Sequence, residues 1–302
     1  MKNQGIYEAL VAQLDKLARH NRQGSFRTKE RYYEAFKRFC VFLADEYRLQ
    51  KLANMSGKHL VAYAERMQER GLSASTIKTD LAAIRFFHDK IEYAKYRLPD
   101  NDELGIELER RRFGGVDRTW STPEFHRALI IAAAADREDY VLAFYLARLC
   151  GLRIHECFRI DTAIAEQAIR ENSITIKGKG GKLRTVPIED ERVPMMLRKL
   201  LLVTQRGHKL LVSDDKKTNI AMRELQNFIY AHRHEIQDQG DSRPLTYHGL
   251  RHSYAAGKYK QFMDSGRSAL DAHFAVSRLL GHERGDVTDV YLASLKEARH
   301  ED

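Results

Sequence analysis

Apolar residues recur at steps of three and four along the first third of the chain, which is the pattern of amphipathic helices. One such stripe runs from Arg27 to Tyr47. A second predicted helix begins after Ser56, a typical N-cap residue, and stops near Gly71, and a third begins near Ser75. The spacing predicts a compact unit of four helices over roughly residues 1–100.

This pattern breaks between residues 98 and 120. A proline stands at position 99, a short helical piece is expected to end in Arg110, Arg111 and Arg112, and the glycines at 114 and 115 suit a flexible hinge. We therefore place a helical domain at residues 1–112, a linker at 113–120 and a second domain at 121–302.

The second domain changes its period partway along. Thr122 as N-cap and Pro123 at the first helical position predict a helix start, and two helical stretches run to about Cys150. Alternating apolar and polar residues at 173–177 and 183–188 then predict a β-hairpin around the glycine-rich turn 178–182. Helical patterns resume towards the C-terminus. The expected fold is mainly α with a small antiparallel β-sheet (α+β).

The composition is that of a globular protein, because 43% of the 302 residues are hydrophobic and 31% are charged. No stretch approaches the roughly 18 consecutive apolar residues of a membrane span. The N-terminus lacks the apolar core of a secretory signal, so we expect a cytoplasmic protein without membrane contact. The odd set of cysteines, Cys40, Cys150 and Cys157, excludes a disulfide framework, and each should be a small buried hydrophobe.

The charge balance favours a polyanionic partner. The net charge is +9, with 22 basic and 16 acidic residues in 1–115 and 29 and 26 in 116–302. A positive excess in both halves suits a protein that grips a nucleic-acid duplex from two sides. The alternative is a solvated basic surface without a partner.

Four short segments of the second domain carry residues suited to phosphate chemistry. They are GLRIHE at 151–156, the GKGGK hairpin turn at 178–182, TYHGLRH at 246–252, and LGH at 280–282 with Tyr291 nine residues later. Each is a weak signal alone. The glycine-rich turn, for example, lacks the spacing and the Ser or Thr of a nucleotide-binding P-loop.

Together and in this order, the segments resemble the tyrosine recombinase (phage integrase) family. Its signature is an Arg in a GLR-x-x-E context, a Lys in a β-hairpin turn, H-x-x-R, and LGH followed by a Tyr. The matching region covers about residues 120–292. The six positions implied to be catalytic are Arg153, Lys179, His248, Arg251, His282 and Tyr291.

The resemblance implies an enzyme that cuts and rejoins duplex DNA through a 3′-phosphotyrosyl intermediate. Tyr291 would be the nucleophile, and Arg153 and Arg251 would clamp the phosphate, whose transition state gathers negative charge. Lys179 would protonate the leaving 5′-oxygen. His248 would accept the tyrosine proton or hydrogen-bond the phosphate. His282 would donate to a non-bridging oxygen.

Other residues are expected to support this site. Glu156 should hold the Arg153 segment through hydrogen bonds, and His252 should be structural or contact a phosphate. Lys177 and Lys182 compete with Lys179 for the lysine role. The further candidates for DNA contact, besides Lys177 and Lys182, are Lys78, Arg85, Arg110, Arg111 and Arg112.

The resemblance also implies that residues 1–112 are the core-binding (DNA-binding) domain and residues 121–302 the catalytic domain. The implied setting is a homotetramer on two paired DNA sites, with an optional accessory DNA-bending protein. It implies no metal, ATP or other cofactor, because the phosphotyrosyl link keeps the energy of the broken bond. We favour the integrase of a phage or other mobile element. A Xer-like dimer resolvase, a type IB topoisomerase-like enzyme and a non-catalytic DNA-binding protein that kept the fold are the alternatives.

Overall fold

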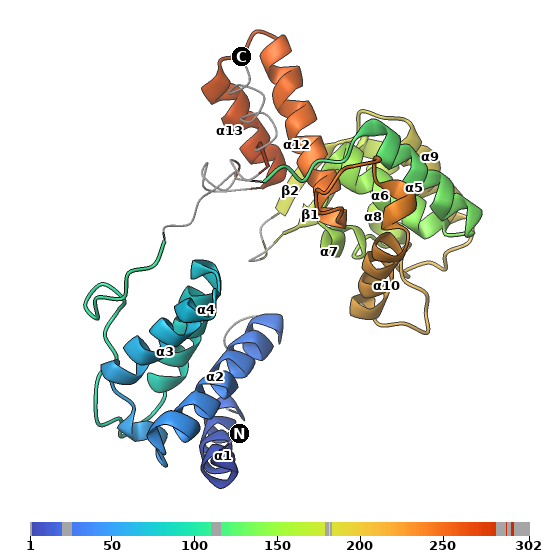
Figure 1. The fold of residues 1–302 in the computed structure, drawn as a ribbon. Coiled ribbons are helices and arrows are strands. Elements are labelled where there is room, and N and C mark those ends of the chain that lie inside the picture. Colours follow the sequence, from blue (N-terminus) through green and yellow to red (C-terminus); the bar gives the residue numbers. More distant parts are fainter. Residues whose placement is uncertain are drawn as a thin grey trace. The chain divides into compact units, whose positions relative to one another are not determined.

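The chain folds as two units, Met1–Arg111 and Arg112–Asp302. A computed structural model describes residues 2–19, 26–109, 116–178, 181, 183–281, 288, 291 and 292 (Figure 1). We call the two parts the N-terminal unit and the C-terminal unit and describe each by itself.

The described residues of the N-terminal unit form four α-helices, as the spacing predicted. They are α1 (Gln4–Arg19), α2 (Phe26–Tyr47), α3 (Gly57–Glu69) and α4 (Ala74–His88), with a 3-10 turn at Leu52–Asn54. Ser56 is the N-cap of α3, and Ser73 caps α4 by accepting a hydrogen bond from the backbone N–H of Thr76. Their apolar faces enclose one core that is rich in aromatic rings, with Phe36, Phe39 and Phe87 in contact.

The prediction of a short helix before Arg110 is wrong for residues 98–109. The structure describes these residues and shows no helix among them. A turn lies at 101–105 instead. The Asp100 carboxylate accepts a hydrogen bond of 2.8 Å from the Glu103 backbone, and Gly105 adopts a left-handed φ of 64° that ends the turn. Local capping by an aspartate therefore outcompetes helix propagation here.

The C-terminal unit is mainly helical and contains one two-stranded antiparallel sheet, so the predicted fold class is confirmed. The predicted hairpin is present, with Ser173 opposite Pro187 and Lys177 opposite Leu183. The elements are α5 (Thr122–Ala134), α6 (Glu138–Cys150), α7 (Ile154–Cys157), α8 (Thr162–Glu171), β1 (Ser173–Lys177), β2 (Leu183–Pro187), α9 (Arg192–Leu201), α10 (Thr218–Ala231), α11 (Arg233–Ile236), α12 (Tyr247–Asp264) and α13 (Ala269–Leu280).

The predicted cap of α5 is wrong by one residue. Ser121, not Thr122, is the N-cap, and it forms a reciprocal pair with Glu124. The Ser121 backbone N–H donates to Glu124 Oε2 at 2.8 Å, and the Glu124 N–H donates to Ser121 Oγ at 3.1 Å. The S-x-x-E spacing satisfies two helix-end donors where a threonine cap would satisfy one.

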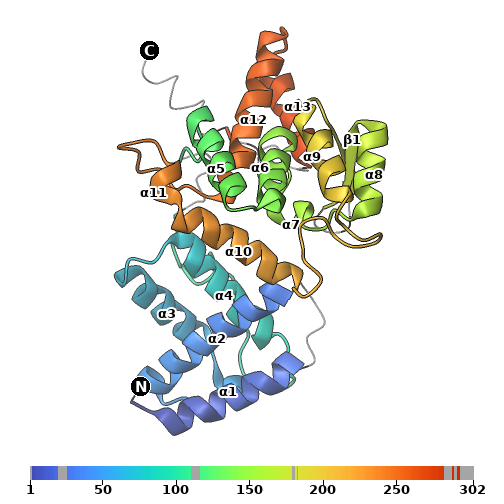
Figure 2. The same cartoon turned by 90° about the vertical axis from the view of Figure 1, so that its right-hand side faces the viewer.

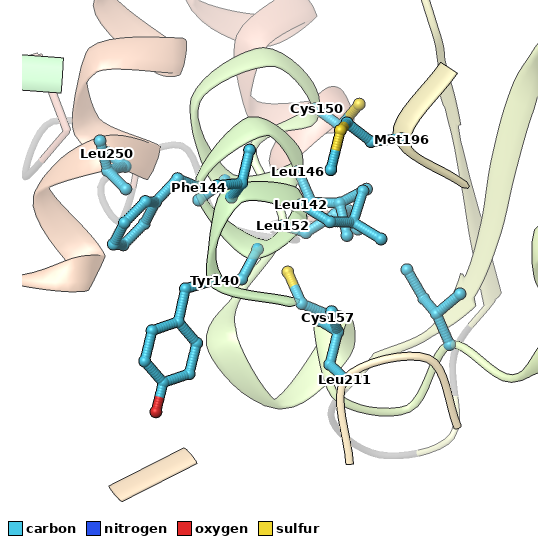
Figure 3. Close-up of a cluster of buried hydrophobic side chains, with 14 of the residues drawn as sticks. Tyr140, Leu142, Phe144, Leu146, Cys150, Leu152, Cys157, Met196, Leu211 and Leu250 are labelled. Carbon is cyan, nitrogen blue, oxygen red and sulfur yellow. The ribbon is translucent and has the colours of Figure 1, made fainter. Parts of the chain in front are cut away.

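Helix α6 forms the centre of the C-terminal unit, where it packs against α5, α9 and α12 (Figure 2). It contributes Tyr140, Leu142, Phe144 and Leu146 to a cluster of buried side chains (Figure 3). All three cysteines are free and buried, as expected, and burial raises the pKa of the Cys150 thiol to about 12. No helix among the described residues is long and apolar enough to span a bilayer.

Helix α12 carries two of the predicted site residues and begins against the segment that precedes α5. The Trp120 indole N–H donates to the Thr246 carbonyl at 2.9 Å, and the Trp120 backbone N–H donates to Ser253 Oγ at 2.8 Å. Gly249 lies in this contact. A Cβ at that position would meet the Arg118 carbonyl oxygen and stand 2.7 Å from the Trp120 ring.

We expect Gly249→Ala to lower the unfolding free energy of the C-terminal unit by about 1–3 kcal/mol, because rigid backbone and indole must move. Gly257 in the same helix has open space within 4 Å of the position that a Cβ would take, so Gly257→Ala is the matched control and should stabilise by about 0.5–1 kcal/mol. Urea unfolding followed by the fluorescence of Trp120, the only tryptophan, measures both. Equal effects of the two substitutions would contradict the contact.

Candidate active site

The Arg153 segment starts where α6 ends. Gly151 closes α6 in the left-handed region with φ 62°, and a Cβ there would run into the Tyr254 ring. Only glycine fits both demands. The chain then enters α7 with Arg153 as its N-cap residue, so the glycine in the GLR motif fixes where this arginine lies.

Glu156 lies at the centre of the site and is buried. Its carboxylate accepts hydrogen bonds from the Arg153 backbone at 2.7 Å and from Arg153 Nη1 at 3.0 Å. It also accepts one from Arg184 Nη2 at 2.6 Å, and Arg251 Nη1 lies 3.9 Å from Oε2. Burial opposes ionisation of this carboxyl, but the charge of Arg184, the hydrogen bond from the Arg153 backbone and the charge of Arg251 together outweigh it and hold its pKa below the usual range.

Arg251 is fully enclosed, with 0% of its surface exposed. Its Nη1 donates to the Gly151 carbonyl at the end of α6, and its Nη2 donates to the Leu280 carbonyl at the end of α13 at 2.7 Å. Burial lowers the pKa of Arg251 to about 10, so the guanidinium keeps its charge at neutral pH. Its Cζ lies 5.4 Å from the centroid of the Tyr291 ring.

Tyr291 and His248 form a hydrogen-bonding pair. The Tyr291 hydroxyl lies 3.1 Å from His248 Nε2. His248 is partly exposed to solvent. Burial of much of its ring, followed by the charges of Arg251 and Arg153, nevertheless lowers its pKa to about 4. The imidazole is therefore neutral at pH 7, and in the tautomer that leaves Nε2 unprotonated it can accept the phenol proton.

His252 packs against this pair from one helical turn along α12. Its ring centroid is 4.5 Å from that of Tyr291 and 5.2 Å from that of His248. It is 1% exposed, and Nε2 has no hydrogen-bond partner in the part of the chain that the structure describes. Burial is the main cause that lowers the pKa of His252 to about 3, and the charges of the neighbouring His248 and Arg118 lower it further.

The sequence analysis missed Arg184 on β2. Its side chain is 9% exposed and links two parts of the site, because Nη2 binds Glu156 and Nη1 donates to the Leu279 carbonyl at 2.6 Å. A Cβ at Gly281 would stand 2.8 Å from Arg184 Cδ. The alternation along the strand could have indicated it, because Arg184 and the buried Val186 are two residues apart and lie on the same face of β2. An arginine on a buried face needs a hydrogen-bond or charge partner.

The structure thus brings Arg153, Glu156, His248, Arg251 and Tyr291 together. Lys179, Lys182, His282 and Arg110–Arg112 lie outside the described residues. Lys177 is exposed at the end of β1. In the described ranges, no group of three or more His, Cys, Asp or Glu side chains is arranged to hold a metal ion.

Two basic candidates of the N-terminal unit are engaged with backbone. Lys78 Nζ donates to the Glu109 carbonyl at 2.9 Å, and Arg85 Nε donates to the Pro99 carbonyl at 2.7 Å. Both side chains therefore tie the segment after α4 back to that helix.

Two family models match the chain. One, described as the phage integrase family, matches residues 124–298, and the other, described as the N-terminal SAM-like domain of phage integrase, matches residues 11–98. The chain is 26% identical over 229 residues to tyrosine recombinase XerC of Vibrio vulnificus, covering 73% of this chain and 66% of the relative. It is 26% identical over 147 residues to tyrosine recombinase XerD of Pseudomonas putida, covering 47% and 45%. It therefore spans less than two thirds of either relative.

Solved structures share the fold. The crystal structure of a lambda integrase tetramer bound to a Holliday junction has a TM-score of 0.66 at 15% identity, covering 93% of this chain and 76% of that one. The Tn1549 transposon integrase in complex with a circular intermediate DNA has a TM-score of 0.62 at 14% identity, covering 98% and 99%. Both pair a helical N-terminal part with the mixed second part found here.

Glu156→Gln keeps the shape of the side chain but removes the charge that Arg153 and Arg184 share. We expect it to lower the unfolding free energy of the C-terminal unit by about 3–5 kcal/mol, as when one member of a buried ion pair is lost. Glu166→Gln is the control, because Glu166 is an exposed residue of α8, and it should stay within about 0.5 kcal/mol of the wild type. An equal cost for both substitutions in urea unfolding would show that Glu156 does not hold the arginines.

The low pKa of His252 predicts a pH dependence of stability. The unfolded chain takes up a proton on this histidine near its ordinary pKa of about 6.5, whereas the native protein does not until about pH 3. Stability is therefore lost as pH falls below about 6.5, by up to about 1.4 kcal/mol per pH unit from this group. His252→Phe should flatten the slope between pH 6 and 5 in Trp120 unfolding curves. Parallel slopes would mean that His252 is charged in the native protein.

Proposed function

The chain belongs to the phage integrase family, and on that basis we propose that it is a site-specific tyrosine recombinase that cuts and rejoins duplex DNA. The observation that carries this proposal is the placement of the Tyr291 hydroxyl 3.1 Å from a neutral His248, beside the buried guanidinium of Arg251. A phenol, a proton acceptor and a fixed cation are the parts that phosphoryl transfer to tyrosine needs.

In the proposed step, the Tyr291 oxygen attacks the phosphorus of a DNA phosphodiester. A bond forms between phosphorus and the tyrosine oxygen, the bond to the deoxyribose 5′-oxygen breaks, and the phenol proton passes to His248. Arg153 and Arg251 stabilise the charge that develops on the non-bridging oxygens. The strand stays attached as a 3′-phosphotyrosyl ester until a 5′-hydroxyl attacks it and restores the phosphodiester.

The side chains that take part in this step differ in access. Arg251 is 0% exposed and Tyr291 is 5% exposed, whereas 24% of the Arg153 side chain is open to solvent. Arg153 is therefore the cation that an incoming phosphate meets first. We propose that the Tyr291 oxygen becomes accessible to phosphorus only when DNA binds.

We further propose roles for two residues outside the described ranges. Lys179, in the turn between β1 and β2, protonates the leaving 5′-oxygen, and His282, after α13, donates to a non-bridging oxygen. The support is the family motif together with the position of the flanking elements, since β2 carries Arg184 and α13 ends at the carbonyls that Arg184 and Arg251 bind.

The substrate we propose is double-stranded DNA, held by a homotetramer on two paired sites, with an optional accessory DNA-bending protein. We place the enzyme as the integrase of a phage or other mobile element. The similarity to XerC and XerD makes resolution of chromosome or plasmid dimers the second candidate. The sequence of the captured DNA separates them, since an integrase cuts at element junctions and a resolvase at a site in the replicon.

Covalent capture tests the chemistry without a known target. The protein is incubated with fragmented genomic DNA, denatured in SDS, and the protein-linked strands are recovered and sequenced. We expect adducts joined through a 3′-phosphate, and Tyr291→Phe should abolish them, a loss of at least about 10³-fold, because no other nucleophile replaces the phenol.

Tyr230→Phe is the matched control, because Tyr230 is a tyrosine with 69% exposure on α10, and it should form adducts as the wild type does. DNA binding by Tyr291→Phe should be unchanged. If the wild type binds DNA but forms no adduct above Tyr291→Phe, the protein is a binding module that kept the fold.

A further inference from the structure

Three aromatic rings meet at the nucleophile. The His252 and Tyr291 centroids are 4.5 Å apart with an interplanar angle of 34°, so the two rings lie partly face to face. His252 meets His248 nearly edge-on at 5.2 Å and 79°, and His248 meets Tyr291 at 5.4 Å and 61°. His252 therefore touches both members of the pair that would transfer the proton.

The helix geometry explains why His252 can do this. His248 and His252 are four residues apart on α12, so their side chains share one face of the helix. Arg251 precedes His252 directly, and its guanidinium binds the ends of α6 and α13. The backbone that carries His252 is thus fixed by Arg251, and the ring has little freedom to withdraw from Tyr291.

The environment of His252 is unusual for a polar side chain. The residue is 1% exposed, and its Nε2 lacks a hydrogen-bond partner in the described part of the chain. Burying such a nitrogen is unfavourable, so a hydrogen bond of Nε2 does not account for the place of this ring. With 1% of its surface exposed, His252 is not accessible to a DNA phosphate either. What remains is the flat face that it presents to Tyr291.

We propose that His252 is a positioning residue for the nucleophile, supporting one face of the Tyr291 ring so that the hydroxyl stays on His248 Nε2. The proposal rests on the recombinase function proposed above. With the His248 hydrogen bond and the nearby Arg251 guanidinium, the His252 face restricts both the tilt and the rotation of the phenol. Small misplacements of a reacting group are costly in rate, so this restriction should be visible in strand cleavage.

The proposed role depends on a flat ring rather than on a charge or a proton. His252→Phe keeps a flat ring and removes the unpartnered nitrogen, whereas His252→Leu has similar bulk but no planar face. The two variants therefore separate positioning from simple filling of space. His126→Leu on α5 is the control for replacing a histidine by leucine, because His126 is exposed.

The first measurement needs no DNA. The protein is labelled with 3-fluorotyrosine, and the ¹⁹F signal of Tyr291, one of 14 tyrosines, is assigned by its loss in Tyr291→Phe. We expect His252→Leu to shift or broaden that signal, because a ring current and a packing face are lost. His252→Phe should leave it narrow, and His126→Leu should leave it unchanged. An unchanged Tyr291 signal in His252→Leu overturns the proposal.

The second measurement is single-turnover cleavage of a nicked duplex made from the captured target sequence. We expect His252→Leu to slow adduct formation about 10- to 100-fold, and His252→Phe by less than about threefold, with DNA affinity unchanged and melting temperature not lowered in either. Cleavage by His252→Leu at the wild-type rate overturns the positioning role. A parallel loss of rate, DNA affinity and melting temperature does so too, because it marks a structural role.

The failures of the two proposals are distinguishable. If the wild type forms no adduct, the recombinase function fails and the positioning role falls with it, while the ¹⁹F signal still decides whether His252 contacts Tyr291. If the wild type forms adducts and His252→Leu matches it in rate, only the inference about His252 falls.

Discussion

The buried carboxylate of Glu156 is the charge on which the site depends. It binds Arg153 and Arg184 directly and lies 3.9 Å from Arg251. Like charges at such distances repel strongly where water is scarce. The Glu156 carboxylate offsets this repulsion, which allows the three guanidinium groups to lie close together. Because Glu156 carries a single negative charge, the cluster keeps a net positive charge. That positive charge suits the DNA phosphodiester proposed above as the substrate.

Helix ends supply the remaining compensation. Arg251 binds the Gly151 carbonyl at the end of α6, and both Arg251 and Arg184 bind carbonyls in the last turn of α13. The last carbonyls of a helix have no partner within it and carry the negative end of its dipole, so they suit cations. Gly151 and Gly281 end these two helices with left-handed turns, which leaves room for the Tyr254 ring and for Arg184.

Much of this was predictable from sequence, and the exceptions have physical reasons. Periodicity and capping predicted the four N-terminal helices and the hairpin. Ordered motifs predicted that Arg153, His248, Arg251 and Tyr291 meet, although they are far apart in the chain. Motifs do not report what lies between such residues. Arg184 was missed because its role depends on which face of β2 is buried, and the place of His252 depends on a ring contact across 39 positions to Tyr291.

The differences in exposure suggest how such a site controls its own chemistry. Arg251, Glu156 and Arg184 hold their positions by internal bonds to helix ends and to one another, so the cation that would stabilise the proposed transition state is already in place in the protein alone. Groups fixed in this way need no reorganisation during the reaction. Tyr291 sits among them with 5% exposure and a neutral proton acceptor at hand. For the recombination proposed above, access to the phenol, rather than assembly of the charges, is then the step that DNA binding has to provide.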